Sequence, residues 1–171
     1  MKYEKGIFIG RFQPFHKGHL NVIELMQKEC KKIIIGIGSA QLKSEDKNPL
    51  NYYARENIIK KVLENSNIDF EIVRVDDKLN DDEWMNYILE TNFNVLYSGN
   101  QLVLDIAKGL KEKEHSNIEI IDVLPLIHCN KSKEISATKV RELIRSKKDD
   151  WKDMVPPEII DLLVNRYIKY F

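Results

Sequence analysis

The chain has 171 residues, with 27 basic and 27 acidic side chains, so its formal net charge is zero. This length suits one domain with a sizeable core, and we expect a single domain over residues 1–171 with a helical C-terminal part at about 136–171. A balanced charge excludes a global electrostatic attraction to nucleic acid or to membrane surfaces, so any anion site has to be local.

Cysteine usage and the apolar runs indicate the compartment. Cys30 and Cys129 lack the spacing of a metal site, and no secretory signal precedes them. No apolar run reaches the roughly 20 residues of a membrane span. We therefore expect a cytoplasmic protein with reduced thiols and with neither a membrane nor a nucleic-acid partner.

Strand and helix patterns alternate along the chain. Continuous or alternating apolar runs predict strands at residues 6–10, 31–39, 68–75, 94–100 and 117–125. Helical spacing predicts helices at 17–28, from about 52, at 81–90, after 100 to about 113, at 136–145 and at 157–170. This alternation is typical of an α/β fold, a Rossmann-like doubly wound parallel sheet of about five strands with helices on both faces. The last two helices would form a short C-terminal helical extension.

Polar and glycine-containing loops follow four of the predicted strands. They read "GRFQPFHKGH", "GSAQ", "DDKLNDDEW" and "SGN" in chain order. Ligands of such sheets bind beyond the carboxyl ends of the strands, at the point where the strand order reverses. The four loops therefore predict one binding site at that edge.

The loop "GRFQPFHKGH" combines the parts of a triphosphate site. A helix that begins near residues 14–16 presents unpaired N–H groups and a positive dipole end to an anion. His16 and His19 share one face of its first turn, and Gly18 lets a ligand approach the backbone. Arg11 adds a planar cation suited to phosphate oxygens. A metal site is disfavoured, because no Cys, Asp or Glu nearby completes the ligand set.

Two motifs resemble the signatures of the nucleotidyltransferase superfamily, whose members transfer a nucleotidyl group from a nucleoside triphosphate. "GRFQPFHKGH" contains the H-x-G-H signature, and "ISATKVR" resembles the partner motif I-S-S-T-x-x-R. The second motif supplies Ile135, Ser136, Thr138 and Arg141, with Ala137 in place of one serine. The two motifs lie far apart in the chain and in the expected order, so together they are more specific than either alone.

Further stretches resemble the archaeal-type nicotinamide mononucleotide adenylyltransferases within that superfamily. These are "GRFQPFHKGHL", "IIIGIGSAQ", "YSGNQLV" and "NPLNYYAR", the last resembling N-P-F-T-x-x-E-R. The resemblance covers about residues 6–165. Lys47 stands where the family has a loop arginine, and Ala54 with Arg55 replaces Glu-Arg.

The resemblance implies an enzyme that transfers AMP from ATP, with Mg²⁺, to nicotinamide mononucleotide, giving NAD and pyrophosphate. The expected catalytic residues are Arg11, His16, His19 and Arg141. The expected ATP-binding residues are Gly10, Phe12, Lys17, Gly18, Ser98, Gly99, Asn100, Ser136 and Thr138. The expected mononucleotide-binding residues are Ser39, Gln41, Lys47, Asp77 and Trp84. No metal ligand is expected from the chain itself, and the protein is expected to form a homo-oligomer.

Two other functions are compatible with these residues. The chain could adenylylate or cytidylylate another phosphorylated acceptor, such as phosphopantetheine, flavin mononucleotide or a polyol phosphate. It could also be a nucleotide sensor without turnover, although the presence of both histidines with Arg11 and Arg141 disfavours this. At Trp84, packing in helical register with Tyr87 and stacking on a ligand are both open. "GIGSAQ" lacks the third glycine of a dinucleotide fingerprint.

Overall fold

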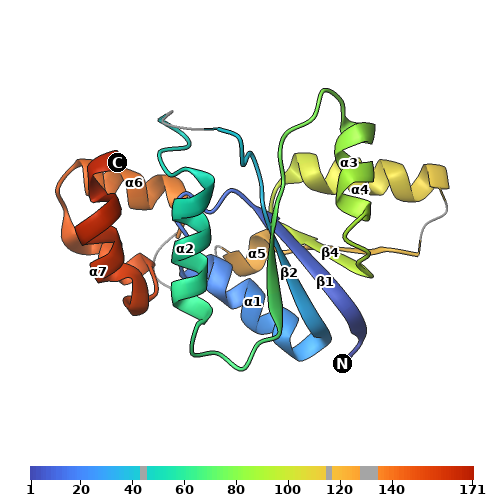
Figure 1. Ribbon diagram of the computed structural model, residues 1–171, viewed down its shortest axis with the longest axis horizontal. Coiled ribbons are helices and arrows are strands. Elements are labelled where there is room, and N and C mark those ends of the chain that lie inside the picture. Colours follow the sequence, from blue (N-terminus) through green and yellow to red (C-terminus); the bar gives the residue numbers. More distant parts are fainter. Residues whose placement is uncertain (43–45, 115–116, 128–134) are drawn as a thin grey trace.

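The computed structural model describes residues 1–42, 46–114, 117–127 and 135–171 (Figure 1). Its strands are β1 (Tyr3–Gly10), β2 (Cys30–Ile37), β3 (Phe70–Arg74), β4 (Val95–Ser98) and β5 (Glu119–Asp122). Its α-helices are α1 (Lys17–Glu29), α2 (Tyr52–Leu63), α3 (Asp81–Leu89), α4 (Gln101–Glu114), α5 (Leu124–Ile127), α6 (Ala137–Arg145) and α7 (Ile160–Leu162). The expected alternation of strands and helices is confirmed.

The five strands form one parallel sheet in the order β3-β2-β1-β4-β5. The chain moves outward from β1 to β3 and then returns to place β4 on the other side of β1. This is the strand order of a doubly wound Rossmann-like sheet, so the expected fold class is confirmed. The strand order reverses between β1 and β4, whose carboxyl ends are Gly10 and Ser98.

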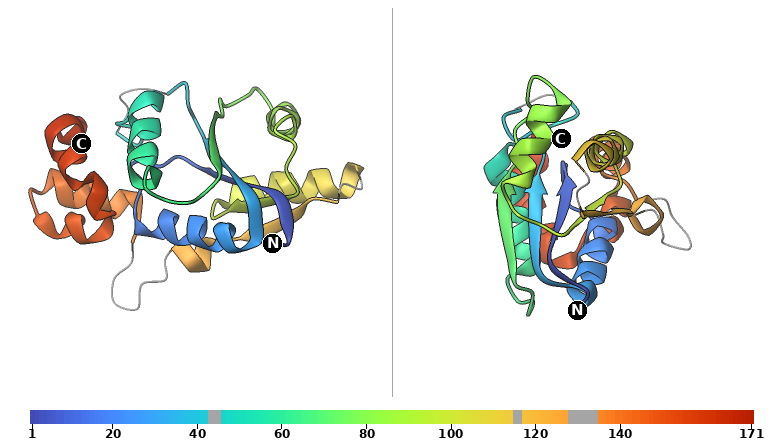
Figure 2. Two further views of the ribbon diagram at one scale, coloured as in Figure 1. Left: turned by 60° about the horizontal axis from the view of Figure 1, so that its bottom comes forward. Right: turned by 90° about the vertical axis from the view of Figure 1, so that its right-hand side faces the viewer.

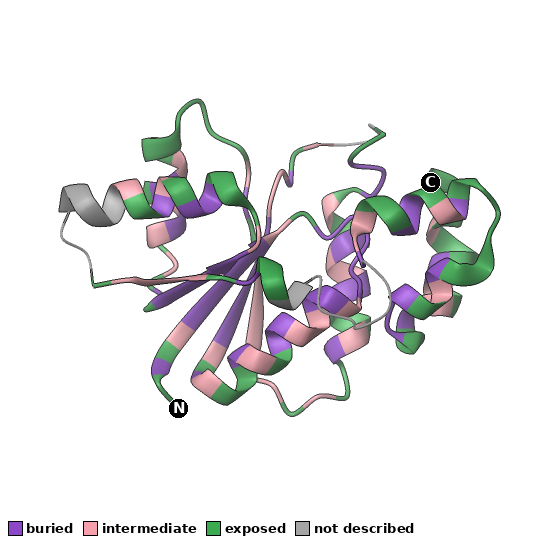
Figure 3. Cartoon of the chain, turned by 180° about the vertical axis from the view of Figure 1, so that it is seen from behind, coloured by how far each residue is buried: buried purple, intermediate pink, exposed green. Residues whose placement is uncertain are grey.

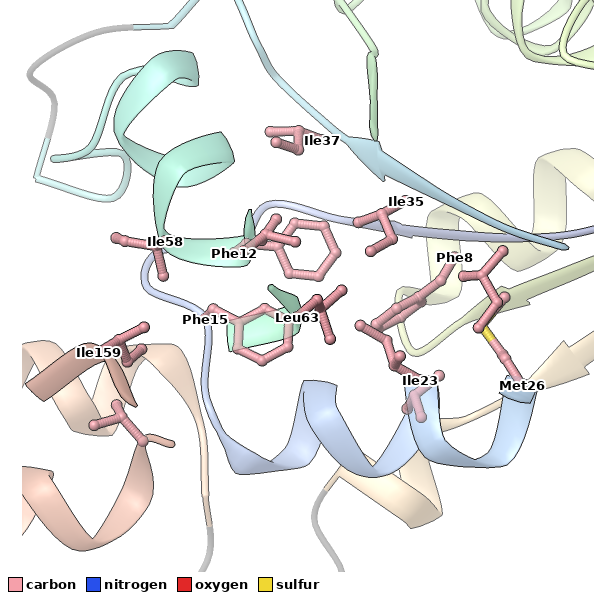
Figure 4. Packing of buried hydrophobic residues seen from close by; sticks show 14 of the residues in the cluster. Phe8, Phe12, Phe15, Ile23, Met26, Ile35, Ile37, Ile58, Leu63 and Ile159 are labelled. Atoms are coloured by element: carbon pink, nitrogen blue, oxygen red, sulfur yellow. The ribbon is translucent and has the colours of Figure 1, made fainter. Parts of the chain in front are cut away.

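Each face of the sheet carries its own apolar core, because successive strand residues point to opposite faces. In one core, Ile7 of β1 stands in register with Ile34 and Leu96 of the neighbouring strands, and helices α3 and α4 cover them. In the other, Phe8 stands in register with Ile35, and α1 and α2 cover them (Figure 4). Burial on both faces explains the uninterrupted apolar runs, and the central strands are mainly buried (Figure 3).

The C-terminal helices lie beside α2 at one end of the molecule, with α4 at the opposite end (Figure 2). Their apolar residues Trp151, Met154 and Ile159 join the α1–α2 core. The predicted helix at 136–145 is confirmed as α6, with Ser136 as its N-cap.

The expectation of one helix over residues 157–170 is wrong. This segment divides into a 3-10 turn, α7, a π-helical stretch and a second 3-10 turn. Only Ile159 and Leu163 are buried in it, so packing fixes a single turn and leaves the hydrogen-bond register of the rest to vary. Helix α5 and a 3-10 helix at Asp149–Met154 were not predicted, because four and six residues are too few for a period to show.

The thiol of Cys30 is free and buried, and burial raises its pKa. Cys129 lies outside the described residues. In the described part of the chain, no helix has both the length and the apolar character needed to cross a membrane.

Candidate active site

A cleft of about 730 Å³ opens at the carboxyl ends of the strands, where the strand order reverses. Six separate parts of the chain line it: residues 8–19, 38–39, 77–84, 99–106 and 136–141, and Leu124 of α5. They include all four predicted strand-end loops and the start of α6, so the sequence located the cleft correctly. Thirteen of the eighteen predicted site residues line this cleft: Gly10, Arg11, Phe12, His16, His19, Ser39, Asp77, Trp84, Gly99, Asn100, Ser136, Thr138 and Arg141.

The two histidines of the first motif contact each other at the start of α1. His16 is the N-cap residue, and its backbone N–H donates to Nδ1 of His19 at 3.2 Å. The two imidazole rings stack with their centroids 3.6 Å apart. Because Nδ1 of His19 accepts a hydrogen bond, the neutral ring carries its hydrogen on Nε2. His19 is therefore a hydrogen-bond donor at Nε2.

His19 is held neutral by its surroundings. It is only 8 % exposed, and its ring lies against Phe12 and Phe15 at centroid distances of 4.8 and 5.4 Å. Burial, and then repulsion from His16, lower the pKa of His19 well below its usual 6.5. A buried neutral donor suits stabilisation of developing phosphate charge better than proton abstraction.

This pKa shift predicts a pH-dependent stability. The unfolded chain takes up a proton on His19 near pH 6.5, whereas the folded chain takes it up only at lower pH. The contribution of His19 to the free energy of unfolding is therefore fully present above about pH 6.5. Below that pH the free energy of unfolding falls, by at most about 1.4 kcal/mol per pH unit from this group. We expect His19→Asn to remove this part of the slope. Urea unfolding of both proteins at pH 7.5 and 5.5 measures it, and equal pH dependence would contradict the assignment.

Arg141 projects from α6 into the wall of the cleft and is 8 % exposed. Its Nη1 donates to the carbonyl of Gln13 at 2.8 Å and its Nη2 to Thr138 Oγ1 at 3.2 Å. Its buried Nε has no hydrogen-bond partner among the described residues. Burial first, then the charges of Arg145 and Arg11, lower the pKa of Arg141. An oriented guanidinium at the wall of a cleft is suited to bind an anion.

The loops after β1 and β4 both line the cleft. Arg11 is exposed and lines the cleft directly after β1. Phe12 lines it too, but its ring is buried against Phe8 and His19, so it supports the imidazole. Gly10 allows this packing, because a Cβ there would stand 3.0 Å from the Phe12 ring. After β4, buried Ser98 accepts the N–H of Asn100 and shapes the turn from below.

A polar cluster forms the side of the cleft beside β2 and β3. The carboxylate of Asp77 accepts hydrogen bonds from Ser39 Oγ at 3.1 Å and from Gln41 Nε2 at 3.0 Å. The backbone N–H of Asp77 donates to Gln41 Oε1 at 3.1 Å, which closes the cluster. Trp84 lines the same side, half-buried, and packs in part on the α3–α4 core. Trp84 therefore packs on the core and also lines the cleft, and its stacking on a ligand stays a prediction.

Five of the predicted residues lie outside the cleft lining. Gly18 is buried in the first turn of α1, and Lys17 beside it is partly exposed. Gln41 reaches the site through Asp77, and Ser98 lies beneath the β4 turn. Lys47 is exposed in the segment before α2.

Two buried polar residues of the site have no role assigned from sequence. Gln13 donates from Nε2 to the carbonyl of Leu50 and accepts its N–H, at 2.8 and 2.9 Å. Arg55 binds backbone carbonyls of the loops after β1 and β2. Both residues stand inside the quoted motifs, but a side chain that binds backbone leaves no pattern of its own in the sequence. Their place in the motifs was the only available signal.

A parallel sheet of this order, with a cationic cleft at its reversal point, defines a nucleotide-binding α/β protein of the Rossmann-like class. The cytidylyltransferase-like family matches residues 7–143 of the chain. Nicotinamide-nucleotide adenylyltransferase of Methanolobus tindarius is 32% identical over 162 residues, covering 93% of this chain and 87% of that protein. The enzyme of the same name from Pyrococcus horikoshii is 31% identical over 163 residues, covering 93% and 82%. The chain belongs to the nucleotidyltransferase superfamily and, within it, to the family of archaeal nicotinamide-nucleotide adenylyltransferases.

Solved structures share the fold. A bifunctional NMN adenylyltransferase/ADP ribose pyrophosphatase of Francisella tularensis, complexed with AMP and a manganese ion, superposes with a TM-score of 0.64 at 22% identity. The match covers 98% of this chain and 51% of that one, so the chain spans about half of its length. Nicotinic acid mononucleotide adenylyltransferase of Plasmodium falciparum superposes with a TM-score of 0.63 at 20% identity, covering 96% and 97%.

Proposed function

We propose that this protein transfers AMP from ATP to nicotinamide mononucleotide, releasing pyrophosphate and forming NAD. One observation carries the proposal. The buried His16–His19 pair, Arg11 and the incompletely bonded guanidinium of Arg141 all face a single cleft at the reversal point of the sheet. Such a set of donors suits a polyphosphate, and membership of the adenylyltransferase family supports the reaction.

The proposed reaction is a direct displacement. An oxygen of the mononucleotide 5′-phosphate attacks the α-phosphorus of ATP and forms a new P–O bond. The bond from the α-phosphorus to the bridging oxygen breaks, and its electron pair leaves with pyrophosphate. Positioning and electrostatic stabilisation suffice for this chemistry, so the protein needs no nucleophile of its own. His19 donates from Nε2, while Arg11 and Arg141 neutralise the charge that moves to the leaving group.

The ion that accompanies ATP would rely on the phosphates for most of its ligands. Among the residues that the structure describes, no group of three or more His, Cys, Asp or Glu side chains could hold a metal. Mg²⁺ is usually bound through substrate phosphates and water, with few protein ligands, so the donor set of this cleft is compatible with it. Bound there, the ion would reduce the negative charge of the phosphates.

The proposed acceptor side of the cleft is the cluster of Ser39, Asp77 and Trp84. Nicotinamide carries a positive charge on its ring, which favours a nearby carboxylate and an aromatic face. Asp77 is exposed and keeps its carboxylate at the lining, and Trp84 stands on the same side. Phosphopantetheine and polyol phosphates offer no cationic ring, so this cluster favours a pyridine nucleotide.

We expect Trp84→Ala to weaken the binding of nicotinamide mononucleotide by roughly 2- to 30-fold, since a cation over an indole contributes about 0.5–2 kcal/mol. The KM for ATP should stay nearly unchanged, because Trp84 lies on the opposite side of the cleft from the α6 arginine. Steady-state kinetics with each substrate varied in turn measure both constants.

Trp84→Phe is the matched variant for this test. It keeps an aromatic face and the packing on the α3–α4 core, so it should recover most of the affinity that alanine loses. A mononucleotide KM that is equal in wild type and Trp84→Ala would assign Trp84 to the core alone. Equal losses for both substrates would indicate a general disturbance of the cleft.

A further inference from the structure

Arg55 on α2 is the largest side chain that the fold buries completely. Its guanidinium does not reach the cleft, and instead donates to backbone carbonyls on two loops that do. Nη1 donates to the carbonyls of Arg11 and Gly38 at 3.0 and 2.7 Å, and Nη2 to that of Ser39 at 3.1 Å. One planar group thus ties the loop after β1 to the loop after β2, across sequence separations of 44 and 16–17 residues.

Both tied loops contain a residue in the left-handed backbone region. Ser39 has φ 46° and Phe12, next to Arg11, has φ 51°. Residues with a Cβ adopt this region only where their surroundings impose it, and such residues gather at functional sites. Arg55 binds the carbonyl of Ser39 itself and the carbonyl just before Phe12. The guanidinium is therefore placed to impose both unfavourable conformations.

The burial of the Arg55 charge carries a desolvation cost. No carboxylate lies within ion-pair distance of Arg55 among the described residues, and backbone carbonyls are the hydrogen-bond partners of its side chain. Burial, and then the charges of Arg74 and Arg11, lower the pKa of Arg55 to about 10, while Tyr52 and Asp77 act in the opposite direction. An apolar side chain of similar size would avoid this cost but would leave the three carbonyls without this donor.

The conformation of Ser39 fixes the geometry of the acceptor cluster. Its Oγ donates to Asp77, whose carboxylate is proposed to face the pyridinium ring. The ATP side has further supports besides this tie, because Arg141 donates to Gln13 and Thr138 and His19 accepts the N–H of His16. A change at Arg55 therefore reaches the acceptor side first.

We propose that Arg55 is a positioning residue for the acceptor subsite: its guanidinium sets the loops after β1 and β2 so that Ser39 and Asp77 meet the mononucleotide. The acceptor part rests on the proposed function, whereas the tie between the two loops does not. Three acceptors on two loops require the planar fork of arginine, which a lysine cannot reproduce.

The test compares Arg55→Lys and Arg55→Met with wild type, and uses Ile58→Val as a control. Ile58 lies one turn further along α2, is buried in the core, and has no side-chain hydrogen bond to offer the loops of the cleft. In the free protein, we expect amide hydrogen exchange at Gly38 and Ala40 to become at least about tenfold faster in both Arg55 variants and to stay near wild type in Ile58→Val. These two amides donate to the carbonyls of Gly10 and Val75.

In steady-state kinetics, the KM for nicotinamide mononucleotide should rise about tenfold or more in both variants, with the KM for ATP changed less than about threefold. Recovery of the mononucleotide KM by Arg55→Lys would overturn the proposal, since charge alone would then be sufficient. Equal effects on the KM of both substrates, or unchanged hydrogen exchange, would also overturn the proposal. Failure of both variants to fold would overturn it too, because Arg55 would then serve the stability of the fold. Accelerated exchange in a protein whose wild type makes no NAD would reject the proposed function and the acceptor role, and keep only the loop tie.

Discussion

We expect His19→Asn to lower kcat by about 10²–10³, the scale for loss of one preorganised donor in an active site. The asparagine amide oxygen can take the place of Nδ1 and accept the His16 N–H, which His19 accepts at 3.2 Å. It offers no donor at the position of Nε2. The change therefore keeps the start of α1 and removes the donor that we propose to face the transferred phosphate. Single-turnover measurements with saturating ATP and mononucleotide give the rate.

His19→Gln is the matched control for this change. Its longer side chain brings an amide nitrogen near the position of Nε2, so it should retain more of the rate than His19→Asn. Because the ring of His19 packs on Phe12 and Phe15, both variants are to be compared at a temperature where thermal unfolding shows them folded. A folded His19→Asn protein with wild-type kcat would remove His19 from the catalytic set.

Replacement of Arg141 should have the second large effect. We expect Arg141→Ala to reduce kcat/KM for ATP by about 10²-fold or more, with a higher KM and a lower kcat together. In the proposed reaction, the phosphate charge beside Arg141 grows as pyrophosphate leaves, so its contact would be stronger in the transition state than in the bound substrate. Arg141→Lys keeps the charge but loses the fork that binds Gln13 and Thr138, so it should recover only part of the loss.

Arg145→Ala is the matched control, because it removes one positive charge from the same helix. The Arg145 side chain is exposed and bonds the carbonyls of Phe171 and Asp46, away from the cleft. It should change kcat/KM for ATP less than about threefold. Equal losses in Arg141→Ala and Arg145→Ala would show a general effect of charge, and α6 would then have only a structural role.

The sequence predicted the sheet well because burial on both faces produces a strong signal. Two runs are apolar without interruption: "GIFIG" in β1 and Ile33–Ile37 in β2. Both belong to strands in the interior of the sheet. The cleft was predictable for a topological reason, since carboxyl ends of parallel strands meet at one edge. The broken C-terminal helix was not, because its few buried side chains leave the local hydrogen bonding undetermined by residue type.

Residues that act through the backbone were beyond sequence reasoning. Arg55 and Gln13 bind carbonyls and amides of distant loops, and any residue type can supply those partners. The role of Trp84 was ambiguous for another reason. Its position on α3 lets it pack on the core, and the same residue also lines the cleft. Only the three-dimensional arrangement separates such roles.

Incubation of the wild-type protein with Mg-ATP and single acceptors, with pyrophosphate release as the readout, tests the central claim most directly. The acceptors are nicotinamide mononucleotide, nicotinic acid mononucleotide, flavin mononucleotide, phosphopantetheine and a polyol phosphate, each also run with CTP. We predict pyrophosphate release with ATP and nicotinamide mononucleotide, equal in amount to the NAD formed, and a slower reaction with the nicotinic acid form, whose added carboxylate Asp77 would repel. Release with flavin mononucleotide or phosphopantetheine and none with either pyridine nucleotide would contradict the account, as would tight ATP binding without turnover of any acceptor.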